Sequence, residues 1–208
     1  MKKYASVLTL MLLSVTMAGA AYAVQNPPVA DRTLENFQTA FNGESNAHAR
    51  YLAFAAKADQ EGYGGVASLF RAAARAEEIH ASNHAQQIRK LGGNPQAKVE
   101  TPVVKSTQVN LEVAIRGETY ERDIMYPDFR KQAWALGNKD AVRMFNYARE
   151  AEAEHAKLFM EAYENFGNGQ GKSRTYYVCE VCGYTTKDLD FAKCHTCFSP
   201  KDKYVQVS

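Results

Sequence analysis

Residues 74–84 read ARAEEIHASNH and put a glutamate and two histidines where a helix should be apolar. Apolar residues recur at steps of three and four on both sides of this stretch, so Glu77, His80 and His84 share the face that should point into a core. A buried carboxylate without a partner is energetically costly. The stretch therefore predicts a buried helix whose polar side chains contact a binding partner.

Three other stretches show the same helical period, so the sequence predicts four helices of similar length. The connection in the middle is the long one, because residues 94–107 contain two prolines and lack helical periodicity. A ferritin-like topology needs such a connection to carry the chain back along the bundle. The predicted helices cover about residues 34–61, 66–91, 108–136 and 140–166, the third with a kink near Pro127.

Length and composition fit a mainly α protein with a small second domain. The chain has 208 residues, 46% of them hydrophobic, and its formal net charge of +2 argues against a nucleic-acid partner. After the helices, FGNGQGKS (residues 166–173) reads as a flexible linker. We expect a ferritin-like four-helix bundle within residues 24–167 and a small metal-knuckle domain over residues 174–208.

The first 23 residues have the pattern of a secretory signal peptide. Lys2 and Lys3 precede an apolar run that ends in Ala21-Tyr22-Ala23. A membrane anchor is the alternative, but the run is short for a spanning helix. We therefore expect Sec-type export to the periplasm or another exported location, cleavage before Val24, and no membrane attachment afterwards. Residues 24–31 read as a short linker.

The acids and histidines on the apolar faces form a repeated pattern. Glu44 precedes Glu77 by 33 positions, and Glu118 precedes Glu152 by 34. Glu77 and Glu152 each begin a Glu-x-x-His pair, ending in His80 and in a histidine at position 155. Residues three apart share a helix face. Glutamates from two helices with Glu-x-x-His pairs from two others are the ligand set of a di-metal carboxylate site, and mixed oxygen and nitrogen ligands suit iron or manganese.

Glu121 breaks this repeat, since its counterpart on the first helix is Ala47. The site should therefore be lopsided, with a spare carboxylate that could enter when the metal charge changes. His84 is expected to be a hydrogen-bonded or packing histidine beside the site, with a role in metal binding as the alternative. Tyr51 and Tyr126 are expected in the core, where they could also bond the ligating carboxylates.

The C-terminal segment contains two close cysteine pairs, Cys179-x-x-Cys182 and Cys194-x-x-Cys197. Such knuckles fit one tetrahedral iron or zinc ion, and the spacing does not separate the two metals. Disulfides are the competing interpretation, because export implies an oxidising compartment. The segment is too small to fold on its own core, so bound metal should supply much of its stability.

At this point the chain resembles the rubrerythrin family over nearly all of residues 34–208. FNGESNAHARY, RAEEIHASNH, IRGETYERDIMYPDF and AREAEAEHAKLF each resemble one of its ligand-bearing helices, and YVCEVCGY with CHTCF resembles its rubredoxin-like tail. The resemblance implies one iron held by the four cysteines and two irons in the bundle. The implied di-iron ligands, which are also the implied catalytic residues, are Glu44, Glu77, His80, Glu118, Glu121, Glu152 and His155.

The resemblance also implies roles for these residues. Glu77 and Glu152 would bridge the two irons, and Glu121 would exchange with His80 as the oxidation state changes. The tail of one subunit would lie near the di-iron site of its partner, which implies a homodimer. One departure is Phe198, which stands where the family usually has a glycine that relieves strain in the knuckle turn.

Three functions are compatible with the sequence. The first is an exported peroxidase that reduces hydrogen peroxide to water, with electrons supplied through the cysteine site by an external donor, an electron-carrier protein or an NAD(P)H-linked system. The second is ferritin-like oxidation or sequestration of iron. The third is a non-catalytic adaptor with zinc in the tail.

Overall fold

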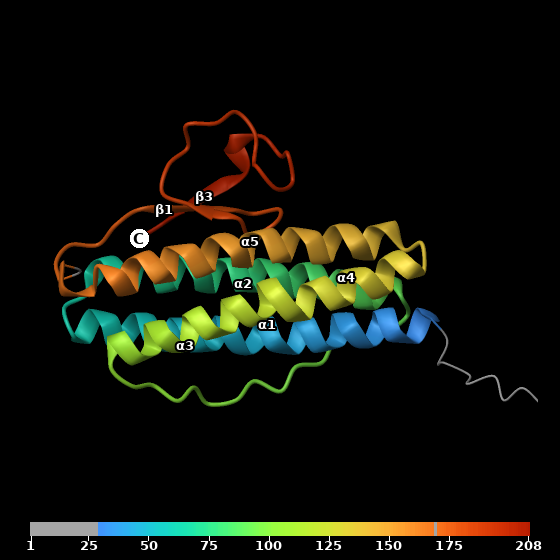
Figure 1. Cartoon of the computed structure of the whole chain (residues 1–208), viewed down its shortest axis with the longest axis horizontal. Coiled ribbons are helices and arrows are strands. Elements are labelled where there is room, and N and C mark those ends of the chain that lie inside the picture. Colours follow the sequence, from blue (N-terminus) through green and yellow to red (C-terminus); the bar gives the residue numbers. More distant parts are fainter. Residues whose placement is uncertain (1–28, 169) are drawn as a thin grey trace, which may run out of the picture.

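The computed structural model describes residues 29–168 and 170–208, and it shows a bundle of long helices with a small tail on one side (Figure 1). This confirms the mainly α, ferritin-like class with a small cysteine-bearing domain after it. The signal-peptide prediction lies outside the described residues. The bundle elements are α1 (Val29–Gln60), α2 (Gly64–Lys90), α3 (Thr107–Tyr120), η1 (Glu121–Met125), α4 (Tyr126–Ala135) and α5 (Lys139–Glu164).

The first helix begins earlier than the sequence predicts. α1 starts at Val29 rather than near residue 34, so the linker prediction for residues 24–31 is wrong from residue 29 onward. Two prolines immediately precede this start, and proline is well tolerated at the beginning of a helix because the first N–H groups have no partner there. Residues 24–28 of the predicted linker lie outside the described residues.

The predicted third helix is one continuous helical path with a wider turn inside it. α3 leads into η1, a π-helical segment, and α4 follows with Pro127 in its first turn. Proline donates no backbone hydrogen bond, and a π segment is one way to absorb the resulting defect without ending the helix. The irregularity expected near Pro127 is therefore present, but it lies just before the proline and contains Glu121.

Two clusters of buried aromatic side chains lie toward opposite ends of the bundle. One contains Tyr51, Phe54 and Phe70. The other contains Phe37 and Phe145, whose rings stack with centroids 4.3 Å apart. These clusters give the bundle an apolar core that does not depend on the polar residues between them.

The long connection between α2 and α3 lies along α1. The side chains of Asn42 and Asn46 bond its backbone, because Asn42 accepts from the Lys98 amide at 2.9 Å and Asn46 accepts from the Glu100 amide at 2.9 Å. Asn46 also donates to the Lys98 carbonyl at 2.9 Å. These hydrogen bonds fix the connection along the surface of α1.

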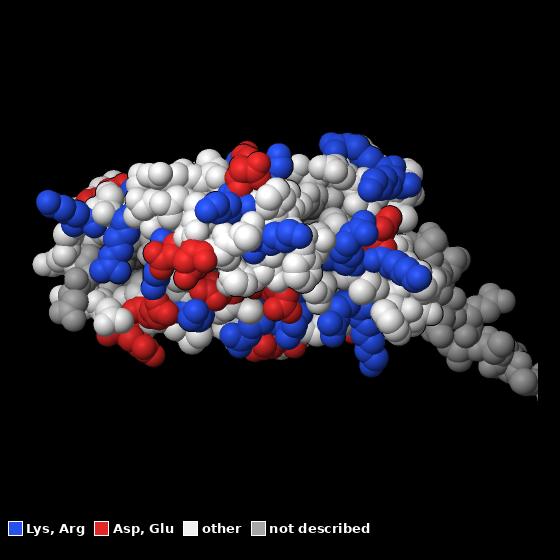
Figure 2. Space-filling view, turned by 90° about the horizontal axis from the view of Figure 1, so that it is seen from above, with Lys and Arg blue, Asp and Glu red and all other residues white. Residues whose placement is uncertain are grey.

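The tail folds around a three-stranded antiparallel sheet in the order β2-β1-β3. β1 and β2 lie against α2 and α5 of the same chain (Figure 1). Acidic and basic side chains are interspersed on the tail-bearing face, as expected for a small net charge (Figure 2). Within the described residues, no helix has the length and apolar character needed to span a membrane. The tail elements are η2 (Phe166–Asn168), β1 (Tyr176–Cys179), β2 (Thr185–Thr186), η3 (Lys201–Lys203) and β3 (Tyr204–Val207).

Candidate metal centres

Six of the seven predicted bundle ligands meet between α1, α2, α3 and α5, and none is more than 1% exposed. They form two groups in which the possible ligand atoms all lie within 4.8 Å of one another. Both groups contain Glu77 and Glu152, so these two glutamates belong to two ion positions at once. The first group is Glu44, Glu77, His80 and Glu152, and the second is Glu77, Glu118, Glu152 and His155.

The two shared glutamates each divide their oxygens between the two histidines. His80 Nδ1 lies 2.8 Å from Glu77 Oε2 and 3.0 Å from Glu152 Oε1. His155 Nδ1 lies 2.9 Å from Glu152 Oε2 and 3.5 Å from Glu77 Oε1. Each carboxylate therefore faces both ion positions, one oxygen to each. This is the arrangement in which two carboxylates bridge a pair of cations.

The far nitrogen of each histidine contacts the tail. His80 Nε2 lies 3.0 Å from the Cys182 carbonyl, which can only accept, so Nε2 carries the proton. His155 Nε2 lies 3.0 Å from Thr185 Oγ1, whose own proton goes to the Gly183 carbonyl. Both contacts therefore fix Nε2 as the donor and leave Nδ1 to bind a metal, the usual role of such outer partners.

A tyrosine holds each of the two glutamates that are not shared. Tyr51 donates to Glu118, and Tyr126 donates to Glu44. Tyr126 also lies 2.9 Å from His84 Nε2, so His84 is a hydrogen-bonded neighbour of the site and belongs to neither ligand group. Because the Tyr126 proton goes to Glu44, His84 Nε2 is the donor in that contact. Both tyrosines thus have the alternative role considered for them from the sequence.

Burial makes the charged forms of these glutamates and histidines energetically costly when no metal is bound. Burial, then repulsion by Glu77, raises the pKa of Glu118 to about 8. Burial lowers the pKa of His80, but the charge of Glu152, 3.0 Å from its Nδ1, and the contact with Glu77 outweigh it and raise that pKa to about 10. Burial alone would raise the pKa of Glu77, yet bonds from both histidines lower it to about 2. Glu118 and His80 retain protons because their pKa values are raised. Divalent ions bound at the site would replace those protons.

Orphaned buried atoms support the same conclusion. Among the described residues, five carboxylate oxygens of the site and His155 Nδ1 are buried without a hydrogen-bond partner. Buried polar atoms are nearly always satisfied in folded proteins. A donor set of four glutamates and two histidines, with oxygens left free, fits two iron ions in composition and in geometry. The atoms concerned are Oε2 of Glu44, Oε1 of Glu77, Oε2 of Glu118 and both carboxylate oxygens of Glu152.

Glu121 lies at the edge of this constellation. It belongs to neither ligand group, and its side chain is half-buried at the start of η1. Burial and the charges of Glu44 and Glu118 raise its pKa well above the usual value. Its would-be counterpart, Ala47, is a buried core residue. The role of Glu121 as a spare ligand and its exchange with His80 stay predictions.

The four cysteines form the second centre. Cys179 Sγ lies 3.6 Å from Cys197 Sγ, and Cys182 Sγ lies 3.6 Å from Cys194 Sγ. All four are free thiols, and these separations are too long for a bond between sulfurs. A tetrahedral ion with metal–sulfur bonds of about 2.3 Å needs sulfurs roughly 3.8 Å apart. The cluster therefore fits one iron or zinc ion, and the disulfide interpretation does not describe this structure.

The two knuckles have the same turn but different residues in it. Gly183 has a φ of 78°, and Phe198 has a φ of 59°, the one positive value at a non-glycine residue in the described part of the chain. A Cβ at position 183 would lie 2.8 Å from His80 Cδ2 and closer still to its Nε2. The first knuckle thus needs glycine for its backbone and for its approach to the bundle. In the second knuckle, a glycine would be needed only for the backbone conformation. Phe198, which stands there, is 71% exposed.

Sequence reasoning missed the contacts that the tail makes with the site. Thr185 and the Cys182 carbonyl hold the two histidines, and Gly183 permits their approach. No periodicity or spacing indicates these roles, because they depend on how the tail docks. The resemblance placed this contact between two subunits. In the structure, a single chain makes it.

Known proteins resemble the chain in both domains. The sequence pattern of the rubrerythrin family matches residues 35–163. Nigerythrin from Nitratidesulfovibrio vulgaris is 39% identical over 173 residues, covering 83% of this chain and 85% of that protein. Rubrerythrin-2 from Clostridium acetobutylicum is 39% identical over 178 residues, covering 83% of this chain and 95% of that one.

Solved structures give the same result. A fully reduced, all-ferrous nigerythrin superposes with a TM-score of 0.77 at 35% identity, covering 99% of this chain and 100% of that one. A bacterioferritin from Desulfovibrio desulfuricans, with a diiron site, covers 69% of the chain at a TM-score of 0.63 and 26% identity. The chain belongs to the rubrerythrin family.

Proposed function

We propose that this chain reduces hydrogen peroxide to two molecules of water, using two electrons and two protons for each peroxide. Family membership makes it an oxidoreductase with iron centres. The substrate and the electron source are the proposal. The observation that carries it is the pair of shared glutamates, Glu77 and Glu152, which each place one oxygen at either ion position.

The bundle residues support a two-electron reaction at one place. When bound, the two iron ions supply the two electrons that break the O–O bond. Glu77 and Glu152 would hold both ions, and Tyr51 and Tyr126 hold the outer carboxylates in place through their hydroxyl protons. The protein thus contributes geometry and charge, and the electron chemistry is that of the metal.

Glu121 can supply protons because it lies between the buried site and the surface. It is half-buried, and burial, with the charges of Glu44 and Glu118, raises its pKa well above the usual value. Its position in η1 places it one helical turn beyond Glu118, at the edge of the site. We assign to it the delivery of protons to the departing oxygen atoms.

The contact between the tail and the bundle supports electron supply from the cysteine site. Cys182 provides one of the four sulfurs, and its own carbonyl accepts the hydrogen bond from His80. The path from the sulfur to His80 Nδ1 therefore crosses one residue, one hydrogen bond and one imidazole ring. An external donor protein or an NAD(P)H-linked carrier would reduce the tail at its exposed side.

The test uses the full chain loaded with iron and reduced without air. Peroxide in one arm and air-saturated buffer in the other should reoxidise it at very different rates, with peroxide far faster and one peroxide consumed per two electrons. Equal rates in both arms would contradict the proposal. Growth of a mineral core beyond the fixed irons would favour iron storage, and a colourless zinc-only protein would favour an adaptor.

Export is a separate part of the proposal. It is supported by the signal-like pattern of residues 1–23, which lie outside the described residues. N-terminal sequencing of the protein from a fractionated native host should find Val24 as the first residue in the exported fraction. Full-length chain in the cytosolic fraction would contradict export and would leave the peroxidase assignment untouched.

A homodimer is also proposed. Three large side chains along the α3–η1–α4 path are well exposed: Tyr120 at 53%, Ile124 at 59% and Trp134 at 74%. Exposed aromatic residues of this kind are enriched at protein interfaces. Light scattering of the iron-loaded protein should give twice the chain mass, and W134E should lower it toward one chain. A monomer at micromolar concentration would contradict the proposal.

A further inference from the structure

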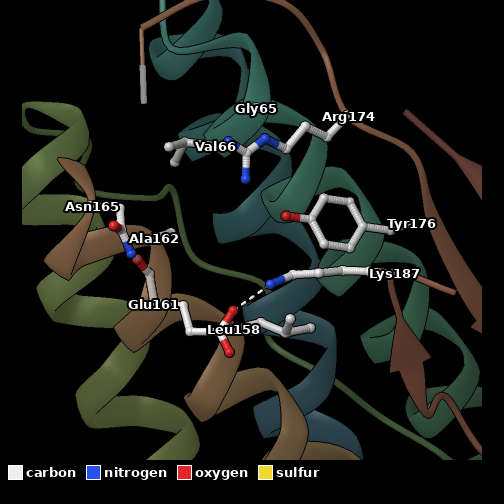
Figure 3. Close-up of a pocket in the computed structure, with 9 residues that line it drawn as sticks. All are labelled: Gly65, Val66, Leu158, Glu161, Ala162, Asn165, Arg174, Tyr176 and Lys187. Atoms are coloured by element: carbon white, nitrogen blue, oxygen red, sulfur yellow. Dashed lines mark hydrogen bonds and ion pairs between the residues drawn. The ribbon is translucent and has the colours of Figure 1, made fainter. Parts of the chain in front are cut away.

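A pocket lies where the tail meets the end of the bundle that contains the start of α2 (Figure 3). Its volume is about 270 Å³, and no metal ligand lines it. The bundle and the tail each contribute a side of it. Gly65, Val66, Leu158, Glu161, Ala162 and Asn165 come from the bundle, and Arg174, Tyr176 and Lys187 come from the tail.

The charge in this pocket comes from Arg174. Lys187 and Glu161 form an ion pair with each other, so their charges cancel. The Arg174 guanidinium points into the pocket, and within the described residues it has no carboxylate partner (Figure 3). The pocket therefore presents one unpaired positive charge with a fork of N–H donors, which suits a single carboxylate.

The hydroxyl of a buried tyrosine opens into the same space. Tyr176 is only 3% exposed, yet its hydroxyl makes no hydrogen bond within the described part of the chain and faces the pocket (Figure 3). Burial raises the Tyr176 pKa, the charge of Arg174 lowers it and the charge of Glu161 raises it, so the hydroxyl stays protonated. A hydroxyl that lines a pocket and has no protein partner is free to donate to a ligand there.

The glycines at the start of α2 shape this arrangement. A Cβ on Gly65 would lie 3.3 Å from the Arg174 Nε, and a Cβ on Gly64 would lie 3.0 Å from the Ser173 amide. Both positions therefore stay small so that the linker can pass and Arg174 can lie over the helix. The side chain of Tyr63 does not cap the N-terminus of α2. The positive end of the helix dipole, at the first turn of α2, therefore also faces this region.

The remaining surface of the pocket is apolar. Val66, Leu158 and Ala162 provide it, next to the charged rim. An inorganic oxyanion would leave this apolar surface uncovered, and a dianion would exceed the single free charge. We propose that the pocket binds a small organic monocarboxylate, with its carboxylate on Arg174 and Tyr176 and its carbon body against Val66, Leu158 and Ala162. The ligand would join the tail to the bundle.

The test is isothermal titration calorimetry of the iron-loaded full chain with butyrate. Saturable binding to one site is expected. R174Q should weaken it by more than about tenfold, because a hydrogen-bonded charge is lost. Y176F should weaken it by about tenfold, and R174K should lie between wild type and R174Q, since lysine cannot make the forked contact. K172Q, on an exposed lysine of the same linker, is the matched control and should change nothing.

Inorganic phosphate in a second arm tests whether the apolar surface contributes. It should bind more weakly than butyrate. Unchanged metal content and visible spectrum in every variant would show that the protein is folded. Absence of saturable butyrate binding, equal affinity in wild type and R174Q, or tighter binding of phosphate than of butyrate would each overturn the assignment.

Discussion

The bundle and the tail hold their metal centres in opposite ways. In the bundle, the ligands lie between two clusters of aromatic side chains that pack without them. In the tail, the buried cluster consists of Cys179, Cys182 and Cys194, with Tyr184 and Tyr204 packed against them. The bundle thus has a core to which a metal site has been added, whereas the ligands of the tail are themselves its core.

The bundle and the tail also differ in the charge of the side chains that they bury. The bundle buries four glutamates and two histidines together, so its own fold is opposed by charge until cations neutralise it. The tail buries thiols, which are small and apolar when protonated. Metal should therefore decide whether the tail folds, and should change only how stable the bundle is. Four predictions test this difference, from the largest expected effect to the smallest.

Removal of the metal is expected to unfold the tail and to leave the bundle helical. Binding of a structural ion to a thiolate site contributes roughly 10 kcal/mol, more than so small a domain gains from packing. Hydrogen exchange measured with and without a chelator should show loss of protection over Tyr176–Cys179 and Tyr204–Val207, with protection kept over most of Gly64–Lys90. Equal protection of both parts would contradict the comparison.

The metal-free bundle should lose stability as pH rises from 7 to 10. The folded pKa values of Glu118, about 8, and His80, about 10, both exceed their ordinary values of 4.5 and 6.5. The folded state therefore binds more protons than the unfolded state in this window, and the free energy of unfolding falls as they leave. The lowered pKa values of Glu77 and His84 act only below this window.

Urea unfolding followed by the helical signal measures this effect. A decrease of at least ~2 kcal/mol is expected between pH 7 and pH 10 without metal, and a much smaller one with iron bound. A metal-free protein whose stability is flat or rises over this range would show that the acids are not buried together.

Gly183→Ala should separate the tail from the bundle. The new Cβ would strain the backbone at a φ of 78° and press on the ring of His80. Gly137→Ala is the matched control, because Gly137 also has a positive φ, 67°, with nothing within 4 Å of the added Cβ. The control should cost about 1 kcal/mol, and Gly183→Ala about 1–3 kcal/mol more.

The difference should also appear in electron supply. Reduction of the bundle irons through the tail should be slower in Gly183→Ala than in Gly137→Ala, because the new Cβ would disturb the hydrogen bond between the Cys182 carbonyl and His80. Stopped-flow spectroscopy of both variants would measure it. Equal rates in Gly183→Ala and Gly137→Ala would mean that the contact with His80 does not carry the electrons.

Phe198→Gly should give the smallest effect and the opposite sign. Phe198 has a φ of 59°, and its exposed ring packs against little, so glycine should relieve the strain and stabilise the tail by about 1 kcal/mol. Phe198→Ala keeps the strained backbone and should change little. Thermal unfolding of the cysteine site, followed by its visible absorption, distinguishes the two. A less stable Phe198→Gly would assign the ring a packing role.

The sequence predicts local features of this molecule well. Glu77 with His80, and Glu152 with His155, could be placed on one helix face because three residues make nearly one turn. The structure brings all four together. Phe198 could be recognised as strained because the turn after a knuckle cysteine requires a positive φ.

Contacts between segments far apart in the chain could not be predicted in this way. The hydrogen bond between the Cys182 carbonyl and His80 joins residues that are 102 positions apart. No sequence pattern within either segment predicts it. The π segment at Glu121 likewise depends on how the bundle absorbs Pro127. The position of Arg174 beside α2 depends on the path of the linker over two glycines.

Anomalous X-ray diffraction at the iron absorption edge, on crystals of the iron-loaded protein, tests the central assignment most directly. It should show two iron peaks between Glu77 and Glu152, each beside one of the two histidines, and a third among the four cysteine sulfurs. A bundle with no peak, or with a single peak bound by only one of the two glutamates, would contradict the bridged pair.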